Sequence, residues 1–206
     1  TVAGSDPSGG AGLQSDLGVF TAFGCHGLAV VAGLTSQDSM GVRSVRPVPD
    51  GFVGDQLAAL FSDGAPAAAK TGMLATAEAV RAVAAAFHVR PDVPLVVDPV
   101  AASSGGVRLA DADAELAIRN HLTAIAALIA PNAVEAEALT GIRVADLDGA
   151  VAAARRLVQQ GARAALVKGG HWGGDDVTDV LVMDGLADPV LFARPRVGGL
   201  RRVRGT

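Results

Sequence analysis

Short apolar runs alternate along this 206-residue chain with longer, Ala-rich stretches whose apolar residues recur at helical spacing. A clear example is a stripe of four apolar residues: Val151, Ala154, Leu157 and Val158. This spacing predicts a helix, and Gly161 suits its C-terminal cap. The apolar run that comes next is typical of a buried strand. The stretch therefore predicts a helix followed by a strand.

Five more apolar runs, each followed by a helical stretch, show the same alternation. The predicted pairs are residues 1–4 with 11–24, 28–36 with 51–63, 67–72 with 75–88, 94–100 with the region after it, and 126–130 with 132–141. Repeated βα units of this kind favour a largely parallel sheet between helical layers. We therefore predict an α/β fold: a three-layer αβα sandwich with a mostly parallel central sheet.

The chain shows no fixed-period repeat and no compositional break, and its length suits one α/β domain. We expect residues 1–206 to form a single domain. The first residues carry neither the charged region nor the long apolar region of a signal peptide. The chain begins without methionine and stops at Thr206, within what looks like a glycine loop, so we expect both ends to be truncated.

The composition narrows the classes of partner. The chain has 17 basic and 21 acidic residues and no basic stripe interleaved with aromatics, so neither nucleic acid nor an anionic membrane is expected to bind. Every apolar run is interrupted before the roughly eighteen residues needed to cross a bilayer, which predicts no transmembrane helix. The single cysteine, Cys25, excludes an intramolecular disulfide and fits a reducing, cytoplasmic setting. A small solute is the expected partner.

Glycines and polar residues follow the predicted strands at their carboxyl ends, where ligands bind in parallel α/β sheets. Residues 4–12 hold four glycines, so their backbone N–H groups could approach a ligand closely. The spacing matches neither a Walker A loop nor the GxGxxG dinucleotide fingerprint. On spacing alone, a plain tight turn is as good an interpretation as a ligand-binding loop.

Two polar residues are candidates for contacts with a substrate. Asp16 lies one turn into the helix after the glycine-rich segment, where its carboxylate could face the site or interact with solvent and the positive helix end. Without other information, we favour a carboxylate that faces solvent over one that faces the site. Gln37 follows the strand predicted at residues 28–36 and offers a donor and an acceptor, a pairing suited to an aminopyrimidine edge. Its plain alternative is a loop residue.

Four further residues suit the handling of phosphate. Asp98 ends a buried strand, where a carboxylate is a reasonable ligand for Mg²⁺ or water, although Asp-Pro also forms turns. Asn132 and Glu135 have the spacing of a helix capping box. The same geometry could hold Mg²⁺ through water. Lys168 places a cation at another strand end, where a nucleotide phosphate could be met.

Six segments occur in the order seen in the hydroxymethylpyrimidine/phosphomethylpyrimidine kinases of thiamine biosynthesis, a family of the ribokinase superfamily. They are TVAGSDPSGGAGLQSDL, LTSQDSMGV, KTGML, VVDPV, APNAVEAEAL and VKGGH. The resemblance covers nearly the whole chain. It implies a ribokinase-like fold and ATP- and Mg²⁺-dependent phosphorylation of 4-amino-5-hydroxymethyl-2-methylpyrimidine, and in many members of its monophosphate. Members of this family often form homodimers, so a homodimer is possible here.

The resemblance also implies roles for individual residues. Gln37 would recognise the pyrimidine edge, with Asp16 near the amino group or a ring nitrogen. The close and apolar walls would come from Gly4, Ala11, Met73 and Val100.

On the nucleotide side, Asp98 and Glu135 would belong to the Mg²⁺ and phosphate network. Asn132 would be their polar neighbour, and Lys168 would bind the nucleotide.

The catalytic loop of the family is a His-Gly-Thr-Gly-Cys segment whose N–H groups would stabilise charge on the transferring phosphoryl group. Gly205 and Thr206 match the start of this anion-binding loop, and Arg204 stands where His is common. The expected Gly-Cys and the helices after it are not in the sequence, so the catalytic residue is not identified. Residues 101–106 also lack a lysine that relatives often have.

Two other functions stay open. A pyridoxal or pyridoxine kinase has a closely similar sequence and acts on a hydroxymethyl pyridine. A non-catalytic homologue would keep the pyrimidine pocket without turnover. A dinucleotide oxidoreductase is disfavoured because the GxGxxG fingerprint is absent.

Overall fold

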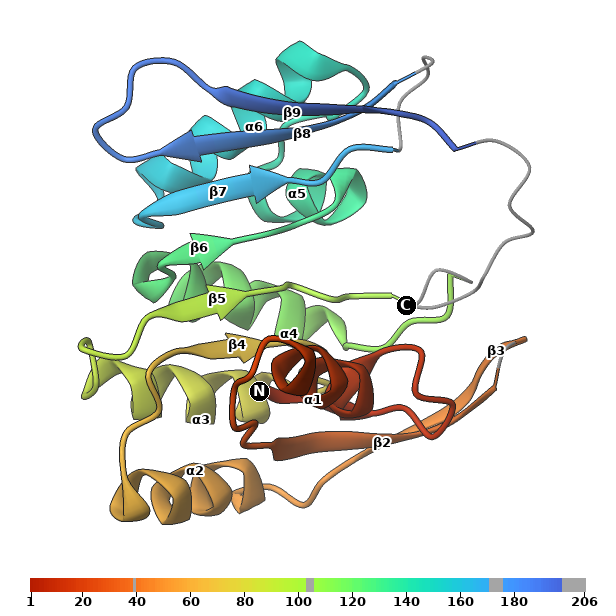
Figure 1. Ribbon diagram of the computed structural model, residues 1–206, viewed down its shortest axis with the longest axis vertical. Coiled ribbons are helices and arrows are strands. Elements are labelled where there is room, and N and C mark those ends of the chain that lie inside the picture. The colour runs from red at the N-terminus through yellow and green to blue at the C-terminus, as the bar shows by residue number, and fades with distance from the viewer. Residues whose placement is uncertain (39, 103–105, 171–175, 198–206) are drawn as a thin grey trace.

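The computed structural model describes residues 1–38, 40–102, 106–170 and 176–197, which form a nine-stranded sheet with helices on both faces (Figure 1). The strand order is β3-β2-β1-β4-β5-β6-β7-β8-β9. The strands are β1 Val2–Ser5, β2 Val30–Asp38, β3 Gly41–Pro47, β4 Ala69–Thr71, β5 Leu95–Val97, β6 Leu128–Ile129, β7 Ala164–Val167, β8 Asp176–Met183 and β9 Val190–Pro195. The helices are α1 Gly12–Ala22, α2 Phe52–Asp63, α3 Ala77–His88, α4 Ala112–Ala117, α5 Ala133–Thr140 and α6 Leu147–Gln159.

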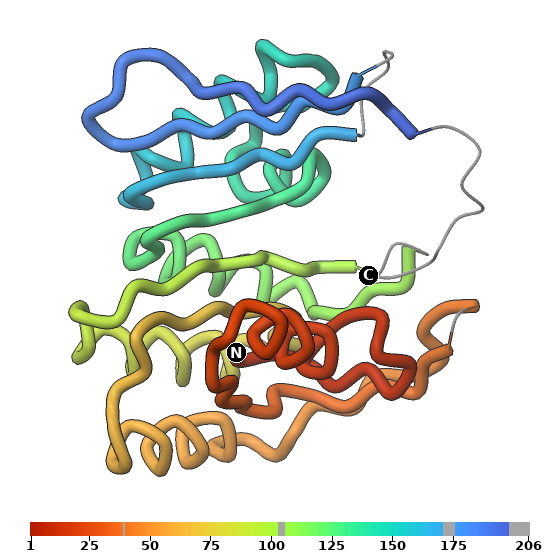
Figure 2. The backbone as a smooth tube through the Cα atoms, in the orientation of Figure 1, coloured from red at the N-terminus to blue at the C-terminus, as the bar shows by residue number. Residues whose placement is uncertain are grey.

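The centre of the sheet is parallel. Strands β2, β1, β4, β5, β6 and β7 pair in parallel, whereas β3, β8 and β9 are antiparallel to their neighbours. The predicted α/β class and mostly parallel sheet are thus confirmed. The carboxyl ends of the parallel strands lie along one edge of the sheet, and the chain leaves them on that side (Figure 2).

The sequence pattern did not predict β3, β8, β9 or the short helix α4. Strand β3 is an edge strand whose Arg43 and Arg46 are exposed, so it lacks the buried apolar run by which the other strands were found. Strand β9 forms the opposite edge of the sheet and is exposed along most of its length. Edge strands face water on more sides than central ones, which weakens their sequence signal.

Helices α2 to α6 form a layer on one face of the sheet, and α1 lies on the other face (Figure 1). The main hydrophobic core lies between the sheet and the layer formed by α2 to α6. In α6, Ala154 and Leu157 are fully buried, while Val151 and Val158 are only partly buried at its margin. Gly161 follows the end of α6 with a φ of +110°, a backbone conformation that favours glycine, as its predicted place at the cap requires.

Two glycines allow α1 to begin close to the end of β1. A Cβ at Gly12, whose φ is +58°, would lie 2.3 Å from the carbonyl oxygen of Gly4. A Cβ at Gly4 would lie 2.3 Å from Cε of Met73. Larger residues would therefore push the helix from the strand and displace Met73, both of which shape the site described below.

The helices of the described segments are all too short or too polar to cross a bilayer.

Candidate functional site

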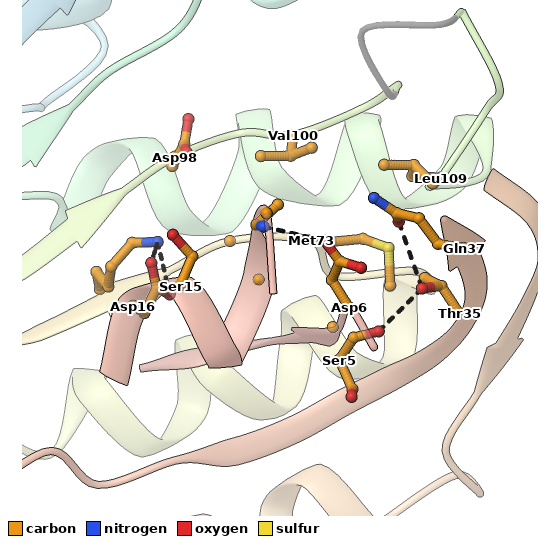
Figure 3. Close-up of a pocket in the computed structure, with 16 residues that line it drawn as sticks. Ser5, Asp6, Ser15, Asp16, Thr35, Gln37, Met73, Asp98, Val100 and Leu109 are labelled. Atoms are coloured by element: carbon orange, nitrogen blue, oxygen red, sulfur yellow. Dashed lines mark hydrogen bonds and ion pairs between the residues drawn. The ribbon is translucent and has the colours of Figure 1, made fainter. Parts of the chain in front are cut away.

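A pocket of about 160 Å³ opens at the carboxyl ends of the parallel strands (Figure 3). Its walls come from the loop between β1 and α1, the first turn of α1, the end of β2, strand β4 and the loop after β5. All six residues assigned to the substrate by resemblance line it: Gly4, Ala11, Asp16, Gln37, Met73 and Val100. The fold thus brings together residues spread over about half of the chain.

Polar and apolar side chains share the lining of this pocket. In the view of Figure 3, Asp16 and Gln37 lie on opposite sides of the pocket with Met73 between them. Val100 and Leu109 add apolar surface along the wall formed after β5. The arrangement suits a flat molecule with an apolar face and polar edges.

Gln37 lies within a strand. This corrects the prediction that it follows a strand ending at residue 36, and it also corrects the alternative that it is a loop residue. Strand β2 continues to Asp38, and Gln37 pairs with Val42 of β3 just after a register shift. The Thr35 hydroxyl lies 3.0 Å from the Ser5 carbonyl oxygen and 3.4 Å from Oε1 of Gln37, so its single hydrogen is shared between the two acceptors. The sheet therefore holds this side chain more firmly than a loop would.

Asp6 organises the loop between β1 and α1, a role that was not predicted from the sequence. Its Oδ1 accepts hydrogen bonds from the backbone N–H and hydroxyl of Ser8 at 2.8 and 2.7 Å, and its Oδ2 accepts one from the Ala11 N–H at 3.0 Å. The side chain is buried. An Asp two residues before a Ser, directly after a strand, is the sequence signal for such a turn. Its carboxylate is thus engaged in holding the loop.

Asp16 is not solvated, so the favoured interpretation of this residue is wrong. Its side chain is 16% exposed and forms an ion pair with Lys70 of β4. Both carboxylate oxygens lie 2.9 Å from Nζ of Lys70. Lys70 was not predicted as a site residue, although a lysine inside an otherwise apolar strand is a visible signal, because a charge there needs a partner.

A second ion pair lies at the ends of β5 and β7. Lys168, directly after β7, donates to Oδ1 of Asp98, directly after β5, at 2.8 Å. The backbone carbonyl of Asp98 also accepts a hydrogen bond from the Val100 N–H at 2.9 Å. Asp98 therefore forms a turn as well, which was the other interpretation of this Asp-Pro pair. The two interpretations of Asp98 are therefore compatible.

Glu135 completes this second cluster. The capping box is present: Asn132 Oδ1 accepts from the Glu135 N–H at 3.0 Å, and Glu135 Oε2 accepts from the Asn132 N–H at 2.8 Å. Burial raises the pKa of Glu135, and the nearby Asp98 adds to this rise. The Asn132 N–H and the Lys168 charge oppose it. Asp98, Lys168 and Glu135 thus form one electrostatic group.

The donor set of this group fits a magnesium ion that is shared with a phosphate. Within the described residues, no three or more His, Cys, Asp and Glu side chains gather as a metal site. Mg²⁺ typically takes only one or two protein carboxylates, together with substrate phosphates and water. The pair of Asp98 and Glu135 meets that requirement.

The predicted anion-binding residues Gly205 and Thr206 lie outside the described residues, as do parts of the 101–106 segment.

The chain is similar to known proteins along most of its length. A family model described as phosphomethylpyrimidine kinase matches residues 6–199. The chain is 44% identical over 197 residues to a thiamine biosynthesis bifunctional protein from Geobacter sulfurreducens, covering 96% of this chain and 40% of that protein. The chain thus spans less than half the length of this relative.

Two solved kinase structures are similar to this chain in fold. The phosphomethylpyrimidine kinase of Clostridium difficile 630 aligns with a TM-score of 0.85 at 34% identity, covering 93% of this chain and 81% of that chain. The ADP complex of Bacillus subtilis pyridoxal kinase aligns with a TM-score of 0.85 at 26% identity, covering 97% of this chain and 74% of that chain. The predicted ribokinase-like fold is confirmed by these neighbours.

Proposed function

The chain belongs to the phosphomethylpyrimidine kinase family, and from this premise we propose that the protein transfers a phosphoryl group from ATP to 4-amino-5-hydroxymethyl-2-methylpyrimidine or to its monophosphate. The first transfer makes a phosphate ester of the hydroxymethyl group, and the second makes a diphosphate. ATP is the co-substrate that a kinase of this family requires. Thiamine biosynthesis is the pathway that uses these pyrimidines.

The observation that carries this proposal is the pocket in which Met73 lies between Asp16 and Gln37. Met73 and Val100 would contact the faces of the ring, while Gly4 and Ala11 would let the backbone approach it closely. Gln37 would offer its amide to the ring edge. An aminopyrimidine has the flat shape and polar edge that this surface fits.

The second cluster would serve the phosphates. Asp98 and Glu135 would hold Mg²⁺ together with phosphate oxygens, and Lys168 would contact the nucleotide. When bound, the ion would neutralise charge on the transferring group. Asn132 would keep Glu135 in place through the capping box. Gly205 and Thr206 would begin the anion-binding loop of the family.

The deciding experiment measures ADP release by the intact protein with Mg·ATP and, in parallel, the pyrimidine alcohol, its monophosphate and pyridoxal, with products identified by mass. Phosphorylated pyrimidines are the expected products. The variant Gln37→Leu should raise KM for the pyrimidine about tenfold, because a directed hydrogen bond is lost. Gln159→Leu, the same change at an exposed position of α6, is the matched control.

The likeness to the Bacillus subtilis enzyme makes pyridoxal the second candidate substrate. Phosphorylation of pyridoxal alone would replace the pyrimidine assignment. Binding of the pyrimidine without ADP release would instead identify the non-catalytic homologue.

A further inference from the structure

Lys70 and Asp16 form a symmetric ion pair in the wall of the pocket. Lys70 stands in the middle of β4, and Asp16 stands one turn into α1. Nζ of Lys70 lies 2.9 Å from each carboxylate oxygen of Asp16. Lys70 is 25% exposed and Asp16 is 16% exposed, so solvent screens this pair less than a surface pair.

Two donor groups make three hydrogen bonds to the Asp16 carboxylate. Lys70 donates to both oxygens, and the Thr1 hydroxyl donates to Oδ2 at 2.6 Å. A carboxylate has about four acceptor positions, two on each oxygen. Within the described part of the chain, Oδ2 therefore has both positions filled, while Oδ1 keeps one. Asp16 thus keeps one open acceptor position, on a side chain that lines the pocket.

The cation also changes the charge of the pocket. Lys70 is the only basic residue among the described residues that line it. The other two acids of the lining, Asp6 and Asp98, are engaged by the β1–α1 loop and by Lys168. Without Lys70, Asp16 would be a partly buried anion with one hydroxyl partner. With it, this end of the pocket is neutral overall.

The surrounding backbone leaves room for the lysine to reach this position. A Cβ at Gly72, two residues after Lys70, would lie 3.7 Å from Nζ of Lys70 and 3.0 Å from Cβ of Ala3. A side chain at Gly72 would therefore press on Ala3 of β1, and it would touch the ammonium group at an ordinary contact distance. Gly72 thus lets β4 leave the sheet close to β1, beside the ammonium group of Lys70.

We propose that Lys70 is a positioning and specificity-determining residue, which holds the Asp16 carboxylate so that Oδ1 accepts a hydrogen bond from the exocyclic amino group of a neutral aminopyrimidine. This inference rests on the proposed function. Its substrate class is a flat, uncharged heterocycle with an N–H donor beside the ring. Lys70 acts through Asp16 and takes no part in the transfer of the phosphoryl group.

The test compares binding of two ligands to the intact protein by calorimetry: the aminopyrimidine alcohol, and the same alcohol without its amino group. Lys70→Met should weaken binding of the aminopyrimidine by roughly tenfold or more, because a charged hydrogen-bond acceptor loses its orientation. Binding of the ligand without the amino group should change less than about twofold. The loss should appear in KM, with kcat nearly unchanged.

Two further variants separate positioning from general damage. Lys70→Arg keeps the charge and should recover part of the lost affinity. Asp16→Asn combined with Lys70→Met should be no weaker than Asp16→Asn alone, since the two residues act as one unit. Arg194→Met removes an exposed cation from β9 and is the matched control. Thermal unfolding of each variant monitors the fold.

Each outcome decides a different point. Equal weakening for both ligands, or additive losses in the double variant, would overturn the role of Lys70 while leaving the kinase assignment intact. If Lys70→Met does not fold, the ratio of the two affinities in Lys70→Arg and Asp16→Asn decides, and an unchanged ratio rejects the proposal. A wild-type protein that binds neither pyrimidine would instead remove the proposed function itself.

Discussion

The two ion pairs at the carboxyl edge of the sheet are built alike but differ in how much of the acid they engage. Lys70 contacts both oxygens of Asp16, whereas Lys168 contacts one oxygen of Asp98. Asp16 is 16% exposed and Asp98 is 29% exposed. Glu135 lies close enough to Asp98 for their charges to interact. The first pair is suited to holding one fixed acceptor, and the second to sharing a cation with a phosphate.

The largest expected effect comes from changing the second pair. Asp98→Asn removes a charge from the proposed Mg²⁺ and phosphate site, so kcat should fall about a hundredfold or more. Affinity for the pyrimidine should stay within about twofold of wild type. Steady-state kinetics and calorimetry measure the two quantities, and Asp92→Asn, which changes an exposed acid outside the pocket, is the control. A loss confined to pyrimidine affinity would contradict the division of roles.

Changing the first acid should reverse this pattern. Asp16→Asn keeps the size of the side chain but replaces one acceptor oxygen with a donor, so the KM for the aminopyrimidine should rise about tenfold to a hundredfold. The kcat and the KM for ATP should change little. A kinetic series with both substrates varied tests this, and a fall in kcat as large as that of Asp98→Asn would erase the contrast between the pairs.

A smaller effect is expected from the second lysine. Lys168→Met should raise the KM for ATP by roughly threefold to tenfold, because this half-exposed pair is partly screened by solvent. The KM for the pyrimidine should be unchanged, in contrast to Lys70→Met. Nucleotide titration of both variants measures the difference, and identical profiles would show that the two pairs are not specialised.

The smallest expected effect concerns pH and stability. Because burial raises the pKa of Glu135, its ionisation opposes folding once the pH exceeds the usual value of 4.5. Glu135→Gln keeps the capping box, so its melting temperature at pH 7 should be about a degree or two above that of wild type. The difference should vanish below pH 4.5. A difference that grows on acidification would contradict this sign.

Much of the site was predictable because it follows from local patterns. Asp98 and Lys168 end apolar strands, and Asn132 and Glu135 have cap spacing, so each could be placed at the sheet edge from sequence alone. Asp16 was misjudged because its partner lies 54 positions away in sequence. Gln37 was misjudged because its strand continues into a polar hairpin with β3, where apolar alternation gives no signal.

The sequence by itself determined the α/β class, the central strands and the glycine-rich turn, since these depend on local periodicity and on the backbone freedom of glycine. It also determined the family, through the order of its segments. Only the tertiary structure decided the strand order, the edge strands and the pairing of Asp16 with Lys70. Such pairings arise when helices and strands from distant parts of the chain pack together, and no local pattern of residues records which charges will then meet.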